Sequence, residues 1–235
     1  VHHIAGHIYA NNYNQDIEYP SLCLVVSGGH SELVLLKAPF EFEVIGETLD
    51  DAVGEAYDKV GRVLNLPYPG GPVLDKMASL GNNTYDLPVP LDDDSYNFSF
   101  SGLKSAVINL NHKAYLRHEV INKNDLAASF QNVVITTLVN KTIKAAKAYN
   151  VKQVMMAGGV SANRGLRNAM NEAVSKLDNV ELLLPPMSCC TDNAMMIALA
   201  AKEMYDLQIF SDLSLGIKPN IDLQQESVSE VKHNG

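Results

Sequence analysis

Apolar and polar residues follow two different periods along the first half of the chain. Residues 1–10 have the apolar spacing of a helix. Residues 21–26 and 32–36 are two apolar, β-branched runs on either side of a Ser-Gly-Gly-His turn, which is typical of a β-hairpin. Between residues 50 and 64 the apolar positions recur every three or four residues, so this segment is predicted to form an amphipathic helix.

The second half alternates between helical and strand patterns. It follows a rigid Pro- and Gly-rich turn at 67–72 and a polar stretch at 80–100 that predicts a loop. Asn124 or Asp125 would cap the long helix that comes next. The polar tail from Ile217 onward is expected to fray. The predicted elements are a helix at 126–149, a strand at 151–157, a helix at 163–176, a strand at 180–184 and a helix at 191–205.

This order of elements predicts an α/β fold with a mixed sheet flanked by helices. The chain has 235 residues and is 46% hydrophobic, which allows a sizeable core in one or two domains. No apolar run reaches the roughly 18 residues of a membrane span. The first residues do not resemble a signal peptide or an initiator methionine, so we expect a fragment of a longer protein.

The cysteines and the net charge indicate the cellular environment and limit the possible partners. The cysteines Cys23, Cys189 and Cys190 are odd in number and two are adjacent, which favours a reduced, cytoplasmic environment. The net charge of −9 argues against broad, unaided binding of nucleic acid. An RNA partner would therefore need a local basic patch, a further segment or a helper protein. Three lysines recur at helical spacing and form either a weak basic stripe or a solvated face: Lys141, Lys144 and Lys147.

A histidine pair near the start is a candidate metal site. His3 and His7 are four residues apart, so on a helix both imidazoles can reach one ion, although surface or packing roles are also open. His2 would point elsewhere. Ile4 stands where a zinc peptidase carries its general-base Glu, so peptidase chemistry would lack its base. Asp192 either caps an Ala-rich helix or is a third ligand that leaves coordination positions open for a substrate.

Two glycine-rich turns are candidate phosphate-binding sites. Residues 25–30 follow a predicted strand, and residues 157–163 connect a strand to a helix. Glycines there allow backbone N–H groups to approach a phosphate closely, especially at a helix N-terminus. The alternatives are an ordinary hairpin turn and a plain connection capped by Ser161.

Further polar groups could complete such a site. Asp58 and Asp75 could bind ribose hydroxyls or a substrate amine, or simply be solvated. Residues 98–104 read Phe-Ser-Phe-Ser-Gly-Leu-Lys, either a loop anchored by two aromatic rings or a wall near a substrate. The sequence alone leaves both pairs of alternatives open.

Taken in order, the motifs are far more specific than any one of them. They read His-His-x-x-Gly-His, Val-Ser-Gly-Gly-His, Gly-Glu-Ala-Tyr-Asp-Lys, Tyr-Pro-Gly-Gly-Pro, Phe-Ser-Phe-Ser-Gly-Leu-Lys, Gly-Gly-Val-Ser-Ala-Asn and Thr-Asp-Asn. This series closely resembles the bacterial TsaD family of tRNA adenosine threonylcarbamoyltransferases, once called glycoproteases, from His2 to about Tyr205.

The resemblance implies an actin-like (ASKHA, ribonuclease H-like) protein of two lobes. Residues 1–19 would end the first lobe and carry its metal-binding helix, 20–205 would form the second lobe, and 206–235 would be a C-terminal segment with a polar tail. Roughly the first hundred residues of the family, with an acidic and serine motif, would precede this chain, so the fragment could be inactive alone.

The resemblance also implies a set of site residues. The metal ligands would be His3, His7 and Asp192, binding one divalent ion, iron in most members and zinc in some. The phosphate and substrate loop would be Val25, Val26, Ser27, Gly28 and Gly29. Further substrate-binding positions would be Asp58, Gly71, Asp75 and Asn163. All these residue types are retained. No residue stands out as the general base.

The implied reaction is transfer of the threonylcarbamoyl group from threonylcarbamoyl-adenylate to N6 of the adenosine beside the anticodon of tRNA, with release of AMP. The family is expected to act in the cytoplasm, away from membranes, with a catalytically inactive TsaB-like paralogue and a small TsaE-like ATPase. The alternatives are a metal-dependent glycoprotease, a nucleotide-binding kinase-like protein of the same fold, and a pure interaction module.

Overall fold

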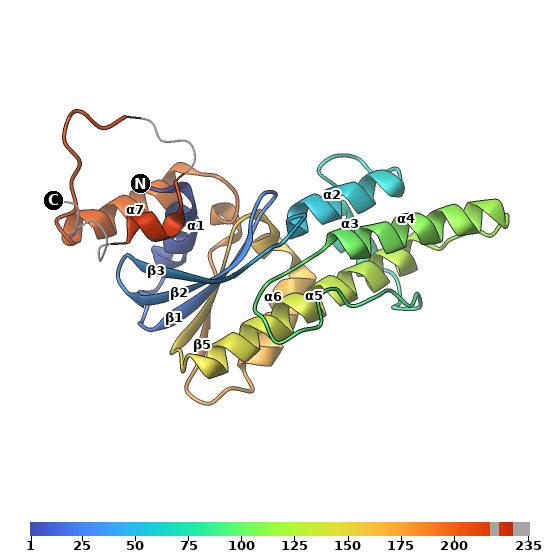
Figure 1. The fold of residues 1–235 in the computed structure, drawn as a ribbon, viewed down its shortest axis with the longest axis horizontal. Coiled ribbons are helices and arrows are strands. Elements are labelled where there is room, and N and C mark those ends of the chain that lie inside the picture. Colours follow the sequence, from blue (N-terminus) through green and yellow to red (C-terminus); the bar gives the residue numbers. More distant parts are fainter. Residues whose placement is uncertain (217–220, 228–235) are drawn as a thin grey trace.

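A five-stranded mixed sheet organises the chain in a computed structural model, which describes residues 1–216 and 221–227. The strand order is β3-β2-β1-β4-β5, with β1 at the centre, antiparallel to β2 and parallel to β4 (Figure 1). The strands are β1 (Ser21–Val26), β2 (Ser31–Ala38), β3 (Glu41–Glu47), β4 (Gln153–Ala157) and β5 (Glu181–Leu183). The predicted α/β fold with a mixed sheet flanked by helices is confirmed.

Helices cover both faces of this sheet and bury two separate cores. On one face, α1 and α7 pack over alternate residues of the central strand such as Cys23 and Val25. The other face, with Leu22 and Leu24, is covered mainly by α2, α5 and α6. The helices are α1 (His3–Tyr9), α2 (Val53–Val63), α3 (Gly70–Ala78), α4 (Ser101–Leu116), α5 (Lys123–Ala148), α6 (Arg164–Val174) and α7 (Ala194–Asp206).

The central strand explains why the sequence shows a continuous apolar run there. Every residue of β1 is buried, because one half of its side chains contacts each core. Strands covered on both faces lose the alternation of apolar and polar residues that marks a half-buried strand. The hairpin predicted from this run and its neighbour is confirmed, with Val26 paired to Ser31 across the turn.

Three elements were not predicted from the sequence. The strand β3 has Glu at 41, 43 and 47, which reads as a loop, yet it completes an antiparallel ladder with β2. The helix α3 starts inside the predicted rigid turn, where Pro72 is tolerated because first-turn N–H groups lack helical partners. The helix α4 buries little beyond Leu103, Val107 and Ala114, so its helical pattern is weak.

Three predicted caps were wrong. The side chain of Asn163, not Ser161, caps α6 by accepting from Leu166 N. The side chain of Asn122, not Asn124 or Asp125, accepts the N–H groups that open α5. Asn193 caps α7 by accepting from Met196 N, so the capping interpretation of Asp192 is wrong as well. The N-cap is the one residue before the helix whose backbone is still extended, and its side chain accepts from the first N–H groups. Where several polar residues adjoin, the sequence does not show which of them takes that position.

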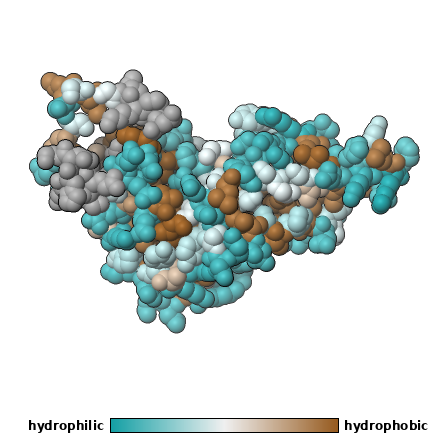
Figure 2. All heavy atoms as spheres, viewed as in Figure 1, coloured by the Kyte–Doolittle hydropathy of each residue, from teal (hydrophilic) through white to brown (hydrophobic). Residues whose placement is uncertain are grey.

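Among the described residues, no helix is long and apolar enough to cross a membrane. The face drawn in Figure 2 is mainly hydrophilic, with separate hydrophobic patches. Of the predicted frayed tail, residues 217–220 and 228–235 lie outside the described part of the chain.

Candidate metal and nucleotide site

Helices from opposite ends of the chain bring three metal-binding side chains together. His3 and His7 lie one turn apart on α1, and Asp192 lies just before α7. The two helices pack closely because α1 has a glycine at their contact. A Cβ atom at Gly6 would lie 2.9 Å from Ile197 Cδ1.

The distances fit a single cation. Asp192 Oδ1 lies 3.1 Å from His7 Nε2 and 3.5 Å from His3 Nε2, and the three ligand atoms all lie within 4.8 Å of one another. Metal–ligand bonds of about 2.1 Å place adjacent ligand atoms roughly 3.0–3.4 Å apart. The donor set therefore needs little movement to bind one ion, and its exposed side leaves room for a substrate.

The environment keeps His7 ready to act as a ligand. Its side chain is 3% exposed, against 54% for His3 and 77% for Asp192. Burial, and then the charge of His3, lowers the pKa of His7, so the ring is neutral at pH 7 and an Nε2 lone pair can bind a metal. His7 Nδ1 is buried with no hydrogen-bond partner among the described residues, so Asp192 is the polar group that holds this ring.

Neighbouring candidates lie outside the metal group. His2 Nδ1 accepts a hydrogen bond from Ile4 N, and His2 Nε2 lies 2.9 Å from the carbonyl oxygen of Ile221. Cys189 and Cys190 are buried and free of disulfides. The described structure therefore groups His3, His7 and Asp192 and leaves these residues aside.

The turn between β1 and β2 presents open backbone. Ser27 Oγ accepts hydrogen bonds from the N–H groups of Gly29 and His30, which hold the turn closed. A Cβ atom at Gly28 or Gly29 would meet nothing within 4 Å. Packing does not require glycine at these two positions, whereas a phosphate lying against the backbone would.

A cavity of about 990 Å³ lies beside this turn. It holds five of the predicted substrate-binding residues: Gly28, Asp58, Gly71, Asp75 and Asn163. The other predicted loop residues, Val25, Val26, Ser27 and Gly29, do not line it. The side chains of Val25 and Val26 are fully buried in the two cores, so any contact of these two residues with a ligand would be through the backbone.

The polar side chains of this cavity are bonded to one another and to helix N-termini. Asp75 accepts from the N–H groups of Arg164 and Gly165 at the start of α6, and from Gln131 Nε2. Gln131 Oε1 accepts from Asn163 and from Tyr57. Sequence reasoning missed Gln131 and Tyr57. The sequence shows Gln131 as a polar residue within a long predicted helix, but it does not indicate which residues Gln131 would bond to.

The segment that leads to the metal group borders this cavity. Thr191 and Met187 line the cavity together with Gly159, whereas His3, His7 and Asp192 do not. The sequence neighbour of Asp192 is thus the link between the metal group and the space that a nucleotide could fill.

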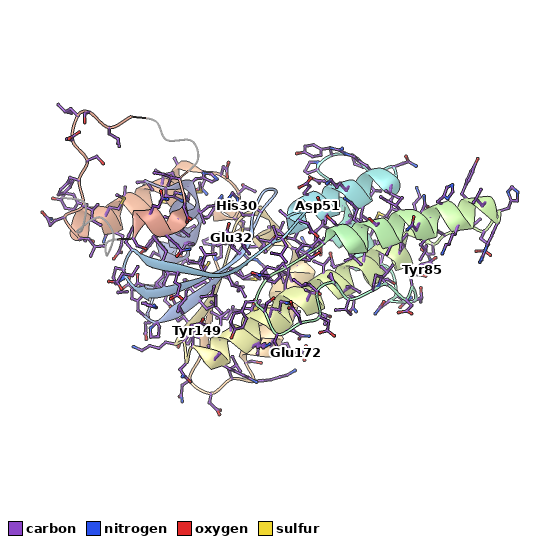
Figure 3. All side chains as sticks on the ribbon, in the orientation of Figure 1. His30, Glu32, Asp51, Tyr85, Tyr149 and Glu172 are labelled. Carbon is purple, nitrogen blue, oxygen red and sulfur yellow. The ribbon has the colours of Figure 1, made fainter. Side chains whose placement is uncertain are left out.

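A second cavity of about 760 Å³ lies on the α1 side of the hairpin. His3 and His30 line it with Glu32 and Glu47, and Figure 3 shows His30 and Glu32 near α1. Burial, and then the charges of Glu47 and Asp222, raises the pKa of Glu32 to about 7. Burial, followed by the two neighbouring histidines, lowers the pKa of His30.

The segment at 98–104 takes the anchoring role. Phe98 and Phe100 are fully buried with stacked rings, and Lys104 pairs with Asp51 at 2.8 Å. Neither cavity is lined by this segment.

Comparison with known proteins gives concordant results. The TsaD family model, described as tRNA N6-adenosine threonylcarbamoyltransferase, matches residues 1–199. Proteins with this name from Bacillus subtilis and Bacillus licheniformis are 56% and 57% identical to the chain, over 95% of its length. The chain spans 65% and 66% of their lengths, slightly under two thirds.

Two solved structures share the fold at low identity. Full-length HypF in the phosphate- and nucleotide-bound form aligns with a TM-score of 0.66 at 14% identity, covering 90% of this chain and 36% of that one. HypF from T. kodakarensis aligns with a TM-score of 0.59 at 15% identity, covering 88% and 37%.

Proposed function

The chain belongs to the TsaD family, and from this premise we propose that it forms part of a tRNA N6-adenosine threonylcarbamoyltransferase. The whole protein would transfer the threonylcarbamoyl group from threonylcarbamoyl-adenylate to N6 of the adenosine beside the anticodon. The observation that supports this most directly is the metal-binding group, whose Asp192 directly follows a residue that lines a cavity of about 990 Å³, since typical small-ligand pockets reach this size.

The metal is proposed to be iron, with zinc as the alternative. Two histidines and one carboxylate with open positions are the donor set of non-haem Fe(II) sites. A bound ion would supply Lewis-acid polarisation of the donor near His3, His7 and Asp192. Metal analysis of the purified whole protein decides between the two ions.

The residues of the chain would bind and orient the adenylate. The turn at Ser27, Gly28 and Gly29 would hold its phosphate and stabilise the charge that develops as AMP leaves. The N–H group of Gly28 is the first candidate donor, because Ser27 N donates to the carbonyl oxygen of His30 and Gly29 N to Ser27 Oγ. Val25 and Val26 would support this loop from the sheet. Asp58, Gly71, Asp75 and Asn163 would place the nucleoside and threonyl parts. These assignments are part of the proposal.

The transfer needs only the adenylate and the tRNA as reactants. The exocyclic nitrogen of the adenosine forms a bond to the carbamoyl carbon and loses a proton. The bond from that carbon to the phosphate oxygen breaks, and AMP leaves with the electron pair. Holding both partners close together converts a slow bimolecular encounter into an oriented transfer.

The alternative functions explain less of the site. A zinc peptidase would place its base next to the first ligand, where the chain has the buried Ile4. A kinase of the same fold would explain the glycine turns, but not the group formed by His3, His7 and Asp192.

The proposal extends to partners, location and boundaries. The partners would be tRNA, an inactive TsaB-like paralogue and a TsaE-like ATPase, in the cytoplasm. A helper fits the charge pattern, because Lys141 pairs with Asp93 and Lys144 with Asp94, which neutralises much of the candidate basic stripe. Residues 1–19 would end the first lobe, 20–205 would form the second, and 206–235 would be the C-terminal segment.

Transfer of labelled threonine to tRNA by the whole protein with its partners tests the function. His7→Ala or Asp192→Ala should abolish transfer, while His112→Ala, an exposed histidine on α4, should leave it unchanged. Normal transfer by either metal-group variant would refute the metal role. Phosphorylation of a small substrate or cleavage of a glycoprotein, without transfer to tRNA, would support the alternatives.

A further inference from the structure

We propose that Gln131 is a positioning residue for the adenylate donor, acting by holding Asp75 and Asn163 in the orientation that binds it. This inference rests on the proposed function of the cavity. Gln131 lies on α5, which packs against α3 and α6 (Figure 1), and it lines the cavity although only 7% of it is exposed.

The hydrogen bonds of Gln131 join three elements. Its Nε2 donates to Asp75 Oδ1 on α3 at 3.0 Å. Its Oε1 accepts from Asn163 Nδ2 at the start of α6 at 2.9 Å, and from the hydroxyl of Tyr57 on α2 at 3.2 Å. One amide thus connects two of the predicted substrate-binding side chains, Asp75 and Asn163.

These bonds permit one orientation of each amide. Asn163 Oδ1 accepts from Leu166 N at 2.8 Å, so Asn163 Nδ2 must face Gln131. Gln131 must then present its oxygen to Asn163 and its NH₂ group to Asp75. The reversed amide would place an oxygen against the Asp75 carboxylate and NH₂ against NH₂, with no hydrogen bond at either end.

Local packing leaves room for this arrangement. A Cβ atom at Gly165 would lie 2.7 Å from Gln131 Nε2, so the start of α6 can approach α5 at this point because residue 165 is glycine. The same stretch supplies the two N–H groups that bind Asp75.

Both side chains held by Gln131 can still bind a ligand. The Asp75 carboxylate has about four acceptor positions, of which three are used within the chain. The second hydrogen of Asn163 Nδ2 makes only a long contact of 3.5 Å with the Tyr57 hydroxyl, which an acceptor on a ligand could replace. Without Gln131, the Asn163 amide loses its main acceptor and Asp75 its side-chain donor. The two groups would then need reordering when the adenylate binds, which weakens binding.

The test measures AMP binding and transfer kinetics in the whole protein. Gln131→Leu keeps the size but removes every hydrogen bond, and should weaken AMP binding and raise KM for the adenylate by about tenfold, with unchanged metal content. Asn132→Leu is the matched control. Asn132 is the next residue on α5, is exposed and does not line the cavity, so AMP binding should stay within about threefold.

Gln131→Glu separates positioning from simple folding. A Glu carboxyl group beside Asp75 retains a proton at low pH, donates it to Asp75 and still accepts from Asn163. At high pH two like charges face each other. AMP binding by this variant should therefore approach the wild-type value near pH 5.5 and fall towards that of Gln131→Leu near pH 8.5, while the wild type changes little.

Several outcomes would overturn the inference. They are wild-type AMP affinity in folded Gln131→Leu, a flat pH profile in Gln131→Glu, an Asn132→Leu defect as large as that of Gln131→Leu, or no AMP binding by the wild type. If the wild type binds AMP, the variants behave as expected and no transfer to tRNA occurs, the proposed function fails while the positioning role of Gln131 is retained.

Discussion

The metal group and the nucleotide cavity satisfy their polar side chains in opposite ways. Asp192 Oδ1 and the Nε2 atoms of His3 and His7 converge, and among the described residues these three atoms make polar contacts only with one another. In the cavity, Asp75 and Asn163 are bonded to Gln131 and to the start of α6. The first arrangement leaves interactions for an ion to supply, whereas the second is ordered before a ligand arrives. Stability should therefore depend on the ion at one site and on the chain itself at the other.

The largest effect should come from metal binding. Adding Fe²⁺ or Zn²⁺ at about a hundredfold excess over Kd should stabilise the protein by about 2.7 kcal/mol, a rise of several degrees in Tm. Asp192→Asn should remove that rise while changing the metal-free Tm little, because this side chain is 77% exposed. Thermal scans with and without metal measure both. An unchanged metal response in the variant would contradict the contrast.

Two glycines of the nucleotide site should respond differently to the same substitution. Gly158→Ala should cost about 2–4 kcal/mol of unfolding free energy, because φ is +86° and the new Cβ would lie 2.5 Å from Val26 O. Gly28→Ala should cost under about 1 kcal/mol, since its Cβ enters open space, but should weaken AMP binding about tenfold.

Urea unfolding and AMP titration of the two glycine variants provide the measurements. Strong destabilisation by Gly28→Ala would show that packing, not a ligand, requires glycine in the hairpin turn. Unchanged AMP affinity in that variant would show that Gly28 does not bind the phosphate.

A smaller effect is expected from Glu32, which lines the same cavity as His3, His30, Glu47 and Asp222. Burial and the charges of Glu47 and Asp222 raise its pKa in the folded protein to about 7, above the ordinary value of 4.5. The unfolded chain loses this proton first, so the contribution of Glu32 to stability falls as pH rises from about 4.5 to 7.

Glu32→Gln removes that titration. The variant should be more stable than the wild type by about 1 kcal/mol at pH 8, after allowance for partial exposure, and no more stable at pH 4.5. Chemical unfolding at the two pH values measures the difference. Parallel stability profiles of variant and wild type would show that the carboxyl group keeps an ordinary pKa.

The smallest effect should come from the candidate basic stripe on α5, which includes Lys144. Lys144 pairs with Asp94 at 2.9 Å, and both side chains are exposed. Lys144→Ala should change stability by less than about 0.5 kcal/mol, because surface ion pairs contribute little. Binding of tRNA by the whole protein should stay within about twofold. A large loss in a filter-binding assay would restore this lysine as an RNA contact.

The sequence by itself determined the local features of this protein. The apolar runs of the hairpin, the amphipathic stretch of α2 and the spacing of His3 and His7 each depend on residues close together in the chain. The order of such segments was enough to predict the α/β class, because layer architecture follows from that order.

Only the tertiary structure decided what depends on distant partners. Residues 41–47 form the strand β3 because their backbone pairs with β2, although the glutamates in this segment do not suggest a strand. Resemblance suggested that Asp192 joins His3 and His7, but the packing of α7 on α1 creates the short distances. Gln131 is one polar residue on a long helix until α3 and α6 bring Asp75 and Asn163 to its amide. The residues next to a polar group in the sequence do not show which distant group will bond to it. The pairing of β3, the short distances in the metal group and the hydrogen bonds of Gln131 therefore required the tertiary structure.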